Sequence, residues 1–429
     1  MDKNRKTSFY ILRDVEKNKA YSNIAANIHI ARQNPSSPSF VRELVFGVLR
    51  RKIYLDYIIG SFVKTPIEKM RAEDITILRM GLYQILYMHS VPDYAAVNES
   101  VFIARIFARG RDGFVNGVLR QYLRDREYLE FPRREDDIVR YLSLRYSYDP
   151  WIVRLWLDEF GEAKAEKLLA AGDDVPPLTI RVNTLKTDRN NLRKRLTERG
   201  FNVYEGRMFK NALLIEGRDV IGGRFYDSGL YSIQDEGAMA PVAYLGPKPG
   251  EIVVDVCAAP GGKTTAIAEM MKNNGDIYAL DIYKRRIRLV DAQASRLGIG
   301  IIKTMVWDAT NTRSELIDRA DRVLCDVPCS GLGTVRHKPE IKYRHWDYEL
   351  EGLPSKQRDI LASSSAYVKP GGVLVYSTCT ISRRENESVT EDFLKKNRDF
   401  VKLEQKQFTT ADDDTDGFYV CKMQRREKT

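Results

Sequence analysis

The stretch at residues 252–271 limits the folds open to this chain more than any other. It begins with the apolar run IVVDV, which is typical of a strand buried on both faces of a parallel sheet. Pro260, Gly261 and Gly262 follow, and they predict a tight turn where a ligand can approach bare backbone. A helix is expected from Lys263 onward. Strand, glycine turn and helix in this order are typical of the start of a βαβ nucleotide site in a doubly wound sheet.

The turn fits some nucleotide ligands better than others. A phosphate-binding P-loop requires a glycine five positions before the Gly-Lys-Thr triplet, and this chain has Cys257 there. A dinucleotide fingerprint requires G-x-G-x-x-G, whereas this turn has only two adjacent glycines. Asp281 ends the next apolar run, about 20 residues on, where an acid can hold ribose hydroxyls. We therefore expect adenosine without a polyphosphate, most commonly S-adenosylmethionine; a purely structural turn is the alternative.

Strands and helices alternate over the rest of the C-terminal part, which predicts a doubly wound, Rossmann-like α/β domain. Its expected elements are strands at 277–281, 301–307, 322–325 and 373–376, helices at 285–297 and 356–367, and a final antiparallel pair near 400–403 and 418–423. Pro370, Gly371 and Gly372 predict a turn into the strand at 373–376. Ligands bind beyond the carboxyl ends of such strands. The glycine turn, Asp281, Asp308 and the loop at 326–333 should therefore meet in one crevice.

Composition excludes several classes of protein. The chain has 429 residues, with 69 Lys+Arg against 59 Asp+Glu and a net charge of +10, which is compatible with a polyanionic partner. It has no apolar run long enough for a bilayer and no signal-peptide pattern, so we expect a cytoplasmic protein without a membrane partner. Its five cysteines lack disulfide or zinc spacing, so neither a disulfide framework nor a metal site is expected. We expect a monomer.

Residues 1–132 predict a helical domain. The apolar stripe of Val41, Leu44, Val45 and Val48 has the spacing of a buried helix face. The segment holds 21 Lys+Arg against 14 Asp+Glu, so a difference of +7 comes from this part of the chain. Three arginines, Arg105, Arg109 and Arg111, fall close together beside Phe107 and Phe114. This group is either part of a nucleic-acid surface or a solvated helix face.

Residues 133–235 predict linker helices followed by a small α+β domain. Helices are expected near 151–160 and 163–171, and the first strand at 178–183. Thr187 is the predicted N-cap of a helix that ends at Gly200 and carries several basic residues. Short strands near 202–204 and 213–215 complete the unit. We interpret it as a second RNA-contacting module, with a plain linker domain as the alternative.

Two cysteines follow buried strands at the predicted ligand edge. Cys329 and Cys379 both occupy such positions, whereas Cys257, Cys325 and Cys421 read as small buried hydrophobic residues. Carbon 5 of a pyrimidine is a poor nucleophile towards a sulfonium methyl group. A thiolate that adds to carbon 6 makes carbon 5 enamine-like, which divides one difficult step into easier ones. Two thiols beside an S-adenosylmethionine site therefore favour covalent methyl transfer to a pyrimidine.

Two families share motifs with this chain. The segment VPDYAAVNESVFIARIF followed by GFVNGVLR resembles the NusB family, which implies an all-α, RNA-binding first domain at residues 1–132. The segments DVCAAPGGKT, DVPCSGLGTVRHKPE and YSTCTISRRENE resemble the RNA cytosine-C5 methyltransferases, and they span the catalytic domain expected at residues 236–429. The combination resembles the bacterial enzymes of this family that methylate 16S ribosomal RNA. It implies S-adenosylmethionine as cofactor and 16S ribosomal RNA as partner.

The resemblance also implies roles for individual residues. Asp281 would bind the ribose hydroxyls, Asp308 would lie near the adenine, and Asp326 would lie between the cofactor and the target base. Cys379 would be the nucleophile and Cys329 would assist release of the product. In DNA enzymes of similar chemistry, however, the nucleophile belongs to the Pro-Cys motif, which here contains Cys329, so the assignment of the two roles stays open. The residues that would cradle the methionine part of the cofactor are Cys257, Ala258, Ala259, Pro260, Gly261, Gly262 and Lys263.

The chain departs from the family pattern beside the reactive groups. Arg383 and Arg384 stand where Pro-Glu is expected, Thr380 replaces the usual Ser, Val327 replaces Ala, and His337 replaces one Arg of a pair. The two arginines either bind RNA phosphate or cap a helix. Two other functions are alternatives to the enzyme: an RNA-binding assembly factor with a vestigial cofactor site, and a transferase for a small molecule. The first would lack a thiol or the glycine turn, and the second would not need basic modules upstream.

Overall fold

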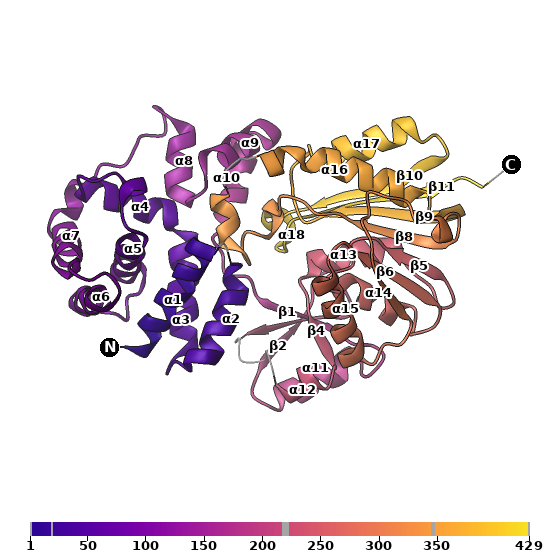
Figure 1. Ribbon diagram of the computed structural model, residues 1–429, viewed down its shortest axis with the longest axis horizontal. Coiled ribbons are helices and arrows are strands. Elements are labelled where there is room, and N and C mark those ends of the chain that lie inside the picture. Colours follow the sequence, from indigo (N-terminus) through magenta and orange to yellow (C-terminus); the bar gives the residue numbers. More distant parts are fainter. Residues whose placement is uncertain (1, 19, 217–222, 345–347, 428–429) are drawn as a thin grey trace. The chain divides into compact units, whose positions relative to one another are not determined.

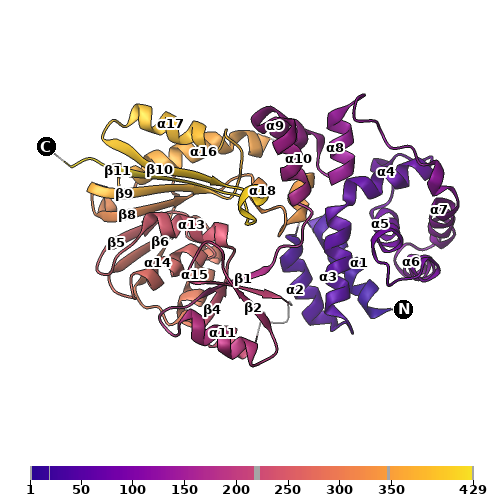
Figure 2. The ribbon, with the colours of Figure 1, turned by 180° about the vertical axis from the view of Figure 1, so that it is seen from behind.

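The computed structural model describes residues 2–18, 20–216, 223–344 and 348–427. The chain forms two compact units, which Figures 1 and 2 show from opposite sides. The first consists of Met1–Asp174 together with Val335–His345, and the second consists of Val175–Thr334 together with Trp346–Thr429. Among the described helices, none is long and apolar enough to cross a membrane.

The first unit is helical, as predicted. Ser37 caps α3 by accepting a hydrogen bond from the Phe40 N–H, and Val41, Leu44 and Val48 point into the core. Helix α8 was not predicted, because its nine residues carry only a short apolar stripe behind the charged run at 133–137. The helices are α1 Lys3–Asn18, α2 Ser22–Gln33, α3 Pro38–Arg50, α4 Lys52–Phe62, α5 Ala72–Tyr87, α6 Asp93–Phe107, α7 Asp112–Asp125, α8 Ile138–Tyr146, α9 Pro150–Phe160 and α10 Glu162–Ala171.

A segment from the C-terminal half of the chain also belongs to this unit. Val335–His345 contains the short 3-10 helix η5 Pro339–Tyr343. Glu340 accepts hydrogen bonds from the backbone N–H of Ser22 at 3.0 Å and from its hydroxyl at 2.6 Å. The fully buried Lys342 donates to Asp173 at 2.6 Å, and burial lowers the pKa of Lys342 to about 8. The chain that follows the Cys329 loop is therefore part of the helical unit's core, which the sequence did not reveal.

The second unit begins with a small antiparallel sheet. Its strand order is β2-β3-β1-β4, and Leu192 and Leu196 of α11 (Arg189–Thr197) pack on it. The predicted cap Thr187 was wrong: Asp188 is the N-cap, and its carboxylate accepts from the Asn191 N–H at 2.9 Å. A carboxylate also interacts better than a hydroxyl with the positive end of the helix. The strands are β1 Leu178–Val182, β2 Asn202–Glu205, β3 Ala212–Glu216 and β4 Tyr231–Ile233, and α12 Arg224–Asp227 precedes β4.

A seven-stranded sheet follows, in the order β10-β11-β9-β8-β5-β6-β7. The five strands from β9 to β7 are parallel, and β10 and β11 pair antiparallel at one end, as predicted. The strands are β5 Ile252–Asp255, β6 Asp276–Asp281, β7 Ile302–Val306, β8 Ala320–Asp326, β9 Val368–Thr378, β10 Phe400–Phe408 and β11 Phe418–Arg425. Pro370, Gly371 and Gly372 lie inside β9 rather than before it, because the chain pairs with β8 on both sides of an irregular register near Arg322.

Helices cover both faces of this sheet (Figure 1). One face packs on α16 (Tyr348–Ser365) and α17 (Glu387–Lys396) through a core that includes Val323, Ile360 and Phe393. The other packs on α13 (Glu236–Leu245), α14 (Gly262–Met270) and α15 (Lys284–Leu297) through a core that includes Val253 and Ile267. A sheet covered on both faces requires continuous apolar strands, which explains the run at 252–256. The doubly wound prediction is confirmed.

Candidate active site

The glycine turn joins β5 to α14. Gly261 has φ +105°, and a Cβ at this position would lie 3.1 Å from the Cα of Val290 on α15, so the turn packs tightly against that helix. The Thr264 hydroxyl donates to Asp255 at 2.7 Å beneath the turn. Burial raises the pKa of Asp255 to about 7, and the nearby charge of Asp326 acts in the same direction. The start of the helix after the turn is therefore bonded to the Asp255 carboxyl group, which ionises less readily than an exposed one.

Asp281 ends β6, the next strand of the sheet. Its side chain is almost fully buried, and one carboxylate oxygen accepts from the Tyr283 N–H at 3.1 Å. The other oxygen lies 3.4 Å from Nη1 of Arg286, whose Nη2 donates to the carbonyl of Ala259 at 2.8 Å. Arg286 therefore connects the acid to the glycine turn. Sequence reasoning missed Arg286, although it lies only five positions after Asp281.

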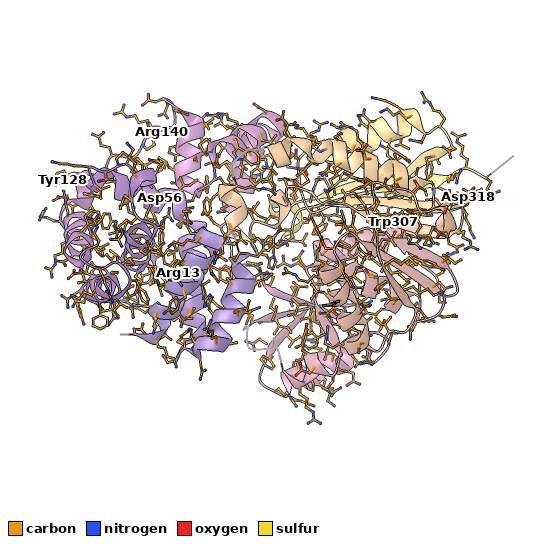
Figure 3. The ribbon with its side chains drawn as sticks, in the orientation of Figure 1. Arg13, Asp56, Tyr128, Arg140, Trp307 and Asp318 are labelled. Atoms are coloured by element: carbon orange, nitrogen blue, oxygen red, sulfur yellow. The ribbon has the colours of Figure 1, made fainter. Side chains whose placement is uncertain are left out.

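Asp308 follows β7 at the same edge of the sheet. The backbone N–H and the hydroxyl of Thr310 donate to it at 3.0 and 2.8 Å, and these hydrogen bonds lower the pKa of Asp308. The preceding residue, Trp307, is labelled in Figure 3, and its indole N–H donates to the carbonyl of Asn311 at 2.7 Å. That hydrogen bond fixes one edge of the indole ring, which sequence reasoning had not assigned to the site.

One pocket brings these strand ends together. Of the predicted residues, Cys257, Ala259, Asp281, Asp308 and Asp326 line it. Ala258, Pro260, Gly261, Gly262 and Lys263 shape the turn but are not among the lining residues. The full lining is Val256, Cys257, Ala259, Asp281, Ile282, Arg286, Trp307, Asp308, Ala309, Asp326, Val327, Pro328, Lys356 and Ile360. The predicted crevice therefore exists, with carboxylates at three successive strand ends and apolar surface from Ile282 and Trp307.

Asp326 ends β8 and is held from two sides. The Ser377 hydroxyl donates to one of its oxygens at 2.8 Å, and the Lys263 ammonium lies 2.7 Å from the other. Burial alone would lower the pKa of Lys263, but the charge and hydrogen bond of Asp326 raise it, and Cys379 contributes in the same direction. The Lys263 ammonium therefore connects the glycine turn to the end of β8.

The two predicted thiols meet. The Sγ atoms of Cys329 and Cys379 lie 3.3 Å apart, after the neighbouring parallel strands β8 and β9. The hydrogen bond with Cys379 raises the pKa of Cys329 well above its usual value, and burial adds to the shift. Cys325 and Cys421 are fully buried in the sheet core, as predicted, whereas Cys257 lies at the pocket, where burial raises its pKa. Cys329 and Cys379 therefore lie in contact with each other.

Buried polar side chains hold the loops of both thiols. The Glu385 carboxylate accepts from the Ser330 N–H and from the Gln357 amide, both at 2.9 Å. Asn386 accepts from the Thr378 hydroxyl at 2.5 Å and donates to the carbonyl of Thr380 at 3.1 Å. Sequence reasoning quoted the segment that contains Glu385 and Asn386 without giving either residue a role. The sequence signal that could have identified them is their polarity, because they belong to a segment that has to pack beside a buried strand.

Comparisons with known proteins identify the family. Residues 242–424 match the family described as 16S rRNA methyltransferase RsmB/F, residues 2–124 match the NusB family, and residues 148–220 match the ferredoxin-like domain of the RsmF/B-like methyltransferases. A probable ribosomal RNA small subunit methyltransferase B from Bacillus subtilis is 37% identical to this chain. The match covers 96% of each protein.

The chain belongs to the RsmB/F family of 16S rRNA methyltransferases. Its fold also matches the crystal structure of PH0851 with TM-score 0.87, 26% identity and coverage of 100% of this chain and 99% of that one. NSun6 from Pyrococcus horikoshii with SFG, an S-adenosylmethionine analogue, shares the fold at TM-score 0.59 and 22% identity, over 65% of this chain and 98% of that one. As a member of this family, the chain is a methyltransferase that uses S-adenosylmethionine.

Proposed function

We propose that this methyltransferase transfers a methyl group to carbon 5 of a cytosine in 16S ribosomal RNA, through a covalent bond between a cysteine and carbon 6 of the base. The observation that carries the proposal is the pair of thiols 3.3 Å apart, in which Cys329 directly follows the pocket-lining Pro328. Methyl transfer to a nitrogen or an oxygen needs no thiol. Carbon 5 of cytosine needs one, because it becomes nucleophilic only after a group has added to carbon 6.

The pocket lining fits S-adenosylmethionine. Carboxylates such as Asp281 accept hydrogen bonds from ribose hydroxyls, and Asp308 can accept one from the adenine amine. Ile282 and Trp307 supply apolar surface for the adenine ring. The bound cofactor supplies a methyl group on a sulfonium centre. Asp326, paired with Lys263, also lines the pocket.

Cys379 is the proposed nucleophile. A thiolate at Cys379 contributes to the raised pKa of Lys263, so the Lys263 ammonium stabilises that thiolate in return. The hydrogen bond between the two thiols has the same effect, since a protonated Cys329 donates its S–H to a Cys379 thiolate. Both contacts favour negative charge on Cys379. The thiolate then adds to carbon 6 of the base.

Cys329 is proposed to assist release of the product. After methyl transfer, carbon 5 loses its proton and the bond between carbon 6 and Cys379 breaks, which restores the aromatic base and frees the Cys379 sulfur. Because the protonated Cys329 lies in contact with Cys379, it can protonate the departing sulfur, and the thiolate that this leaves on Cys329 can accept the carbon-5 proton. Asp326, held by Ser377 and Lys263, is placed to bind the polar edge of the cytosine.

The helical unit is proposed to bind the RNA. It carries the net charge difference of +7 over residues 1–132 and matches the NusB family. Two of the arginines named from sequence are engaged within the unit, because Arg105 pairs with Asp112 and Arg111 pairs with the buried Asp74. These ion pairs support the interpretation that Arg105 and Arg111 lie on a solvated helix face. The base itself has to leave its stack before a buried thiolate can reach carbon 6.

A labelling experiment tests the substrate and the modified atom together. Undermethylated 16S RNA, free or within 30S particles, is incubated with the enzyme and S-adenosylmethionine carrying a labelled methyl group. The RNA is digested to nucleosides, which are separated by mass spectrometry. We expect the label in 5-methylcytidine. Label in an N-methylated or O-methylated nucleoside would contradict the proposed reaction, and label in neither RNA form would contradict the proposed substrate.

A further inference from the structure

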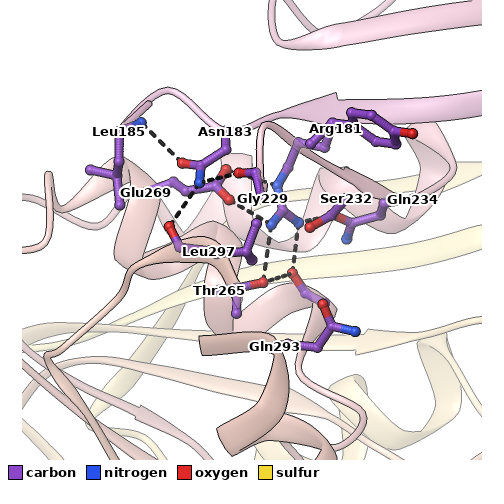
Figure 4. Close-up of polar contacts among 12 residues, drawn as sticks. Arg181, Asn183, Leu185, Gly229, Ser232, Gln234, Thr265, Glu269, Gln293 and Leu297 are labelled. Atoms are coloured by element: carbon purple, nitrogen blue, oxygen red, sulfur yellow. Dashed lines mark hydrogen bonds and ion pairs between the residues drawn. The ribbon is translucent and has the colours of Figure 1, made fainter. Parts of the chain in front are cut away.

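An arginine of the small antiparallel sheet is buried against the helix that follows the glycine turn (Figure 4). Arg181 lies on β1, and its side chain is 4% exposed. It forms a bidentate ion pair with Glu269 of α14, with Nε and Nη2 each 2.9 Å from a carboxylate oxygen. Glu269 is 2% exposed. Sequence reasoning gave neither residue a role.

Every N–H of this guanidinium has an acceptor. Besides Glu269, it donates to the backbone carbonyl of Gly262 at 2.7 Å, to the Thr265 hydroxyl at 3.0 Å and to the side-chain oxygen of Gln234. An arginine has five N–H groups in a rigid plane, so this arrangement fixes its position fully. Thr265 in turn donates to the carbonyl of Gly261 at 2.8 Å. The network therefore ends on the backbone of the glycine turn.

The contacted residues lie on one face of α14. Gly262, Thr265 and Glu269 occupy positions i, i+3 and i+7, so Arg181 holds the first two turns of the helix from one side. The next residue after Gly262 is Lys263, whose ammonium bonds Asp326. A shift of the Gly262 carbonyl would displace both the turn and Lys263. Arg181 thus connects β1 to the backbone that shapes the pocket.

Stability alone does not account for a buried ion pair. The loss of hydration of two buried charges offsets most of their attraction, and apolar pairs of similar volume are often equally stable. A fully bonded guanidinium does, however, impose one geometry on its partners. A second contact steadies the same strand, because the Asn183 amide donates to the carbonyls of Gly229 at 2.8 Å and Leu297 at 3.0 Å. Strand β1 is therefore attached to the ends of both α14 and α15.

We propose that Arg181 is a positioning residue for the cofactor: from the small sheet, it holds the glycine turn in the conformation that binds S-adenosylmethionine. The inference rests on the proposed placement of the cofactor at this turn. Through Arg181 the small sheet contributes to cofactor affinity without touching the cofactor. The pair with Glu269 keeps the arginine aimed at the Gly262 carbonyl.

The test compares two arginine–glutamate pairs of the same domain in the full-length protein. Arg322 forms a bidentate pair with Glu251 at 2.6 and 3.0 Å, at the sheet edge opposite the pocket. Arg181→Met and Arg322→Met are compared by calorimetric titration with S-adenosylmethionine and by urea unfolding. We expect at least tenfold weaker cofactor binding for Arg181→Met and a change below twofold for Arg322→Met. Equal losses of affinity in both variants, or unchanged affinity in Arg181→Met, would overturn the proposal.

A double variant separates positioning from folding. Arg181→Met with Glu269→Met leaves no unpaired buried charge, so it should unfold at a urea concentration close to that of the wild type and still bind the cofactor at least tenfold more weakly. Wild-type affinity in the double variant would mean that the pair has only a structural role. Asp281→Ala is titrated in parallel: if that variant binds normally, the proposed placement of the cofactor is wrong, whatever Arg181 does.

Discussion

Replacing Asp281 tests the placement of the cofactor. A carboxylate offers about four lone-pair positions. The Tyr283 N–H uses one, and Arg286, at 3.4 Å, interacts with the second oxygen. About two positions remain for the ribose hydroxyls. Hydrogen bonds to a charged group each contribute about 1.5–3 kcal/mol, so removing the carboxylate should cost about 3 kcal/mol of binding free energy.

This cost corresponds to about a 150-fold rise in Kd for Asp281→Ala. Asp281→Asn keeps one acceptor oxygen but loses the charge, so about 1.5 kcal/mol and a tenfold rise are expected. Isothermal titration with S-adenosylmethionine measures both variants. Asp276→Asn is the control, because Asp276 begins the same strand at its other end and pairs with Lys303 at 2.7 Å on the surface. Unchanged Kd in Asp281→Ala, or a similar rise in Asp276→Asn, would remove Asp281 from the cofactor site.

Three further predictions concern the thiols, the buried lysine and the glycine turn. Hydrogen peroxide should oxidise Cys329 and Cys379, whose Sγ atoms lie 3.3 Å apart, to a disulfide with release of water. Methylation should then stop, and it should return when dithiothreitol reduces the disulfide. Methylation that persists alongside a confirmed disulfide would mean that the thiols are dispensable. The pKa of Lys342 is lowered to about 8 by burial, below its unfolded value, so the folded state binds fewer protons above pH 8. The free energy of unfolding of the wild type, measured in urea, should therefore rise by up to about 3 kcal/mol relative to that of Lys342→Met between pH 8 and pH 10.5. A difference between the two proteins that does not change with pH would contradict the lowered pKa of Lys342. Gly261→Ala should lower the free energy of unfolding by about 1–3 kcal/mol and should also lower cofactor affinity, because Gly261 has a φ of +105° and lies close to the Val290 backbone. Gly250→Ala is the control: Gly250 also has a positive φ, but the space around its Cβ position is open, so cofactor affinity should stay unchanged.

The elements of the catalytic domain could be predicted because buried parallel strands have a strong sequence signal. The apolar runs before Asp255, Asp281 and Asp326 identify strands, and their polar ends identify the ligand edge. From this rule alone the sequence placed Cys329 and Cys379 at adjacent strand ends. Their 3.3 Å contact depends on loop conformation, which the run of apolar residues does not encode.

Contacts between elements far apart in the chain could not be predicted. Arg181 and Glu269 are separated by 88 positions, and each alone reads as an ordinary charged surface residue. Likewise, Glu340 ends one catalytic motif and Lys342 follows it closely, yet both residues pack in the helical unit. The cap at Asp188 was missed because Thr187 is also a common capping residue and only the geometry distinguishes neighbours. Long-range pairs require the tertiary structure.

The middle region also shows that a very short strand is difficult to predict from sequence. The three residues of β4, Tyr231–Ile233, are missing from the predicted strands, because the apolar pattern continues into α13. In the structure β4 pairs with β1 and completes the small sheet. Arg181 is thereby flanked by β3 and β4 and bonds α14, and Asn183 follows β1 directly and bonds the end of α15.

The central claim is that Cys379 attacks the base and Cys329 assists its release. Each cysteine is changed to alanine, and each variant is incubated with 16S RNA and S-adenosylmethionine before a denaturing gel separates free protein from protein bound covalently to RNA. We predict an accumulated adduct for Cys329→Ala, because attack and methylation proceed while release is slow. No adduct is expected for Cys379→Ala or for the double variant. An adduct in Cys379→Ala and none in Cys329→Ala would reverse the two roles, and no adduct in either single variant would contradict the role of Cys329 in release.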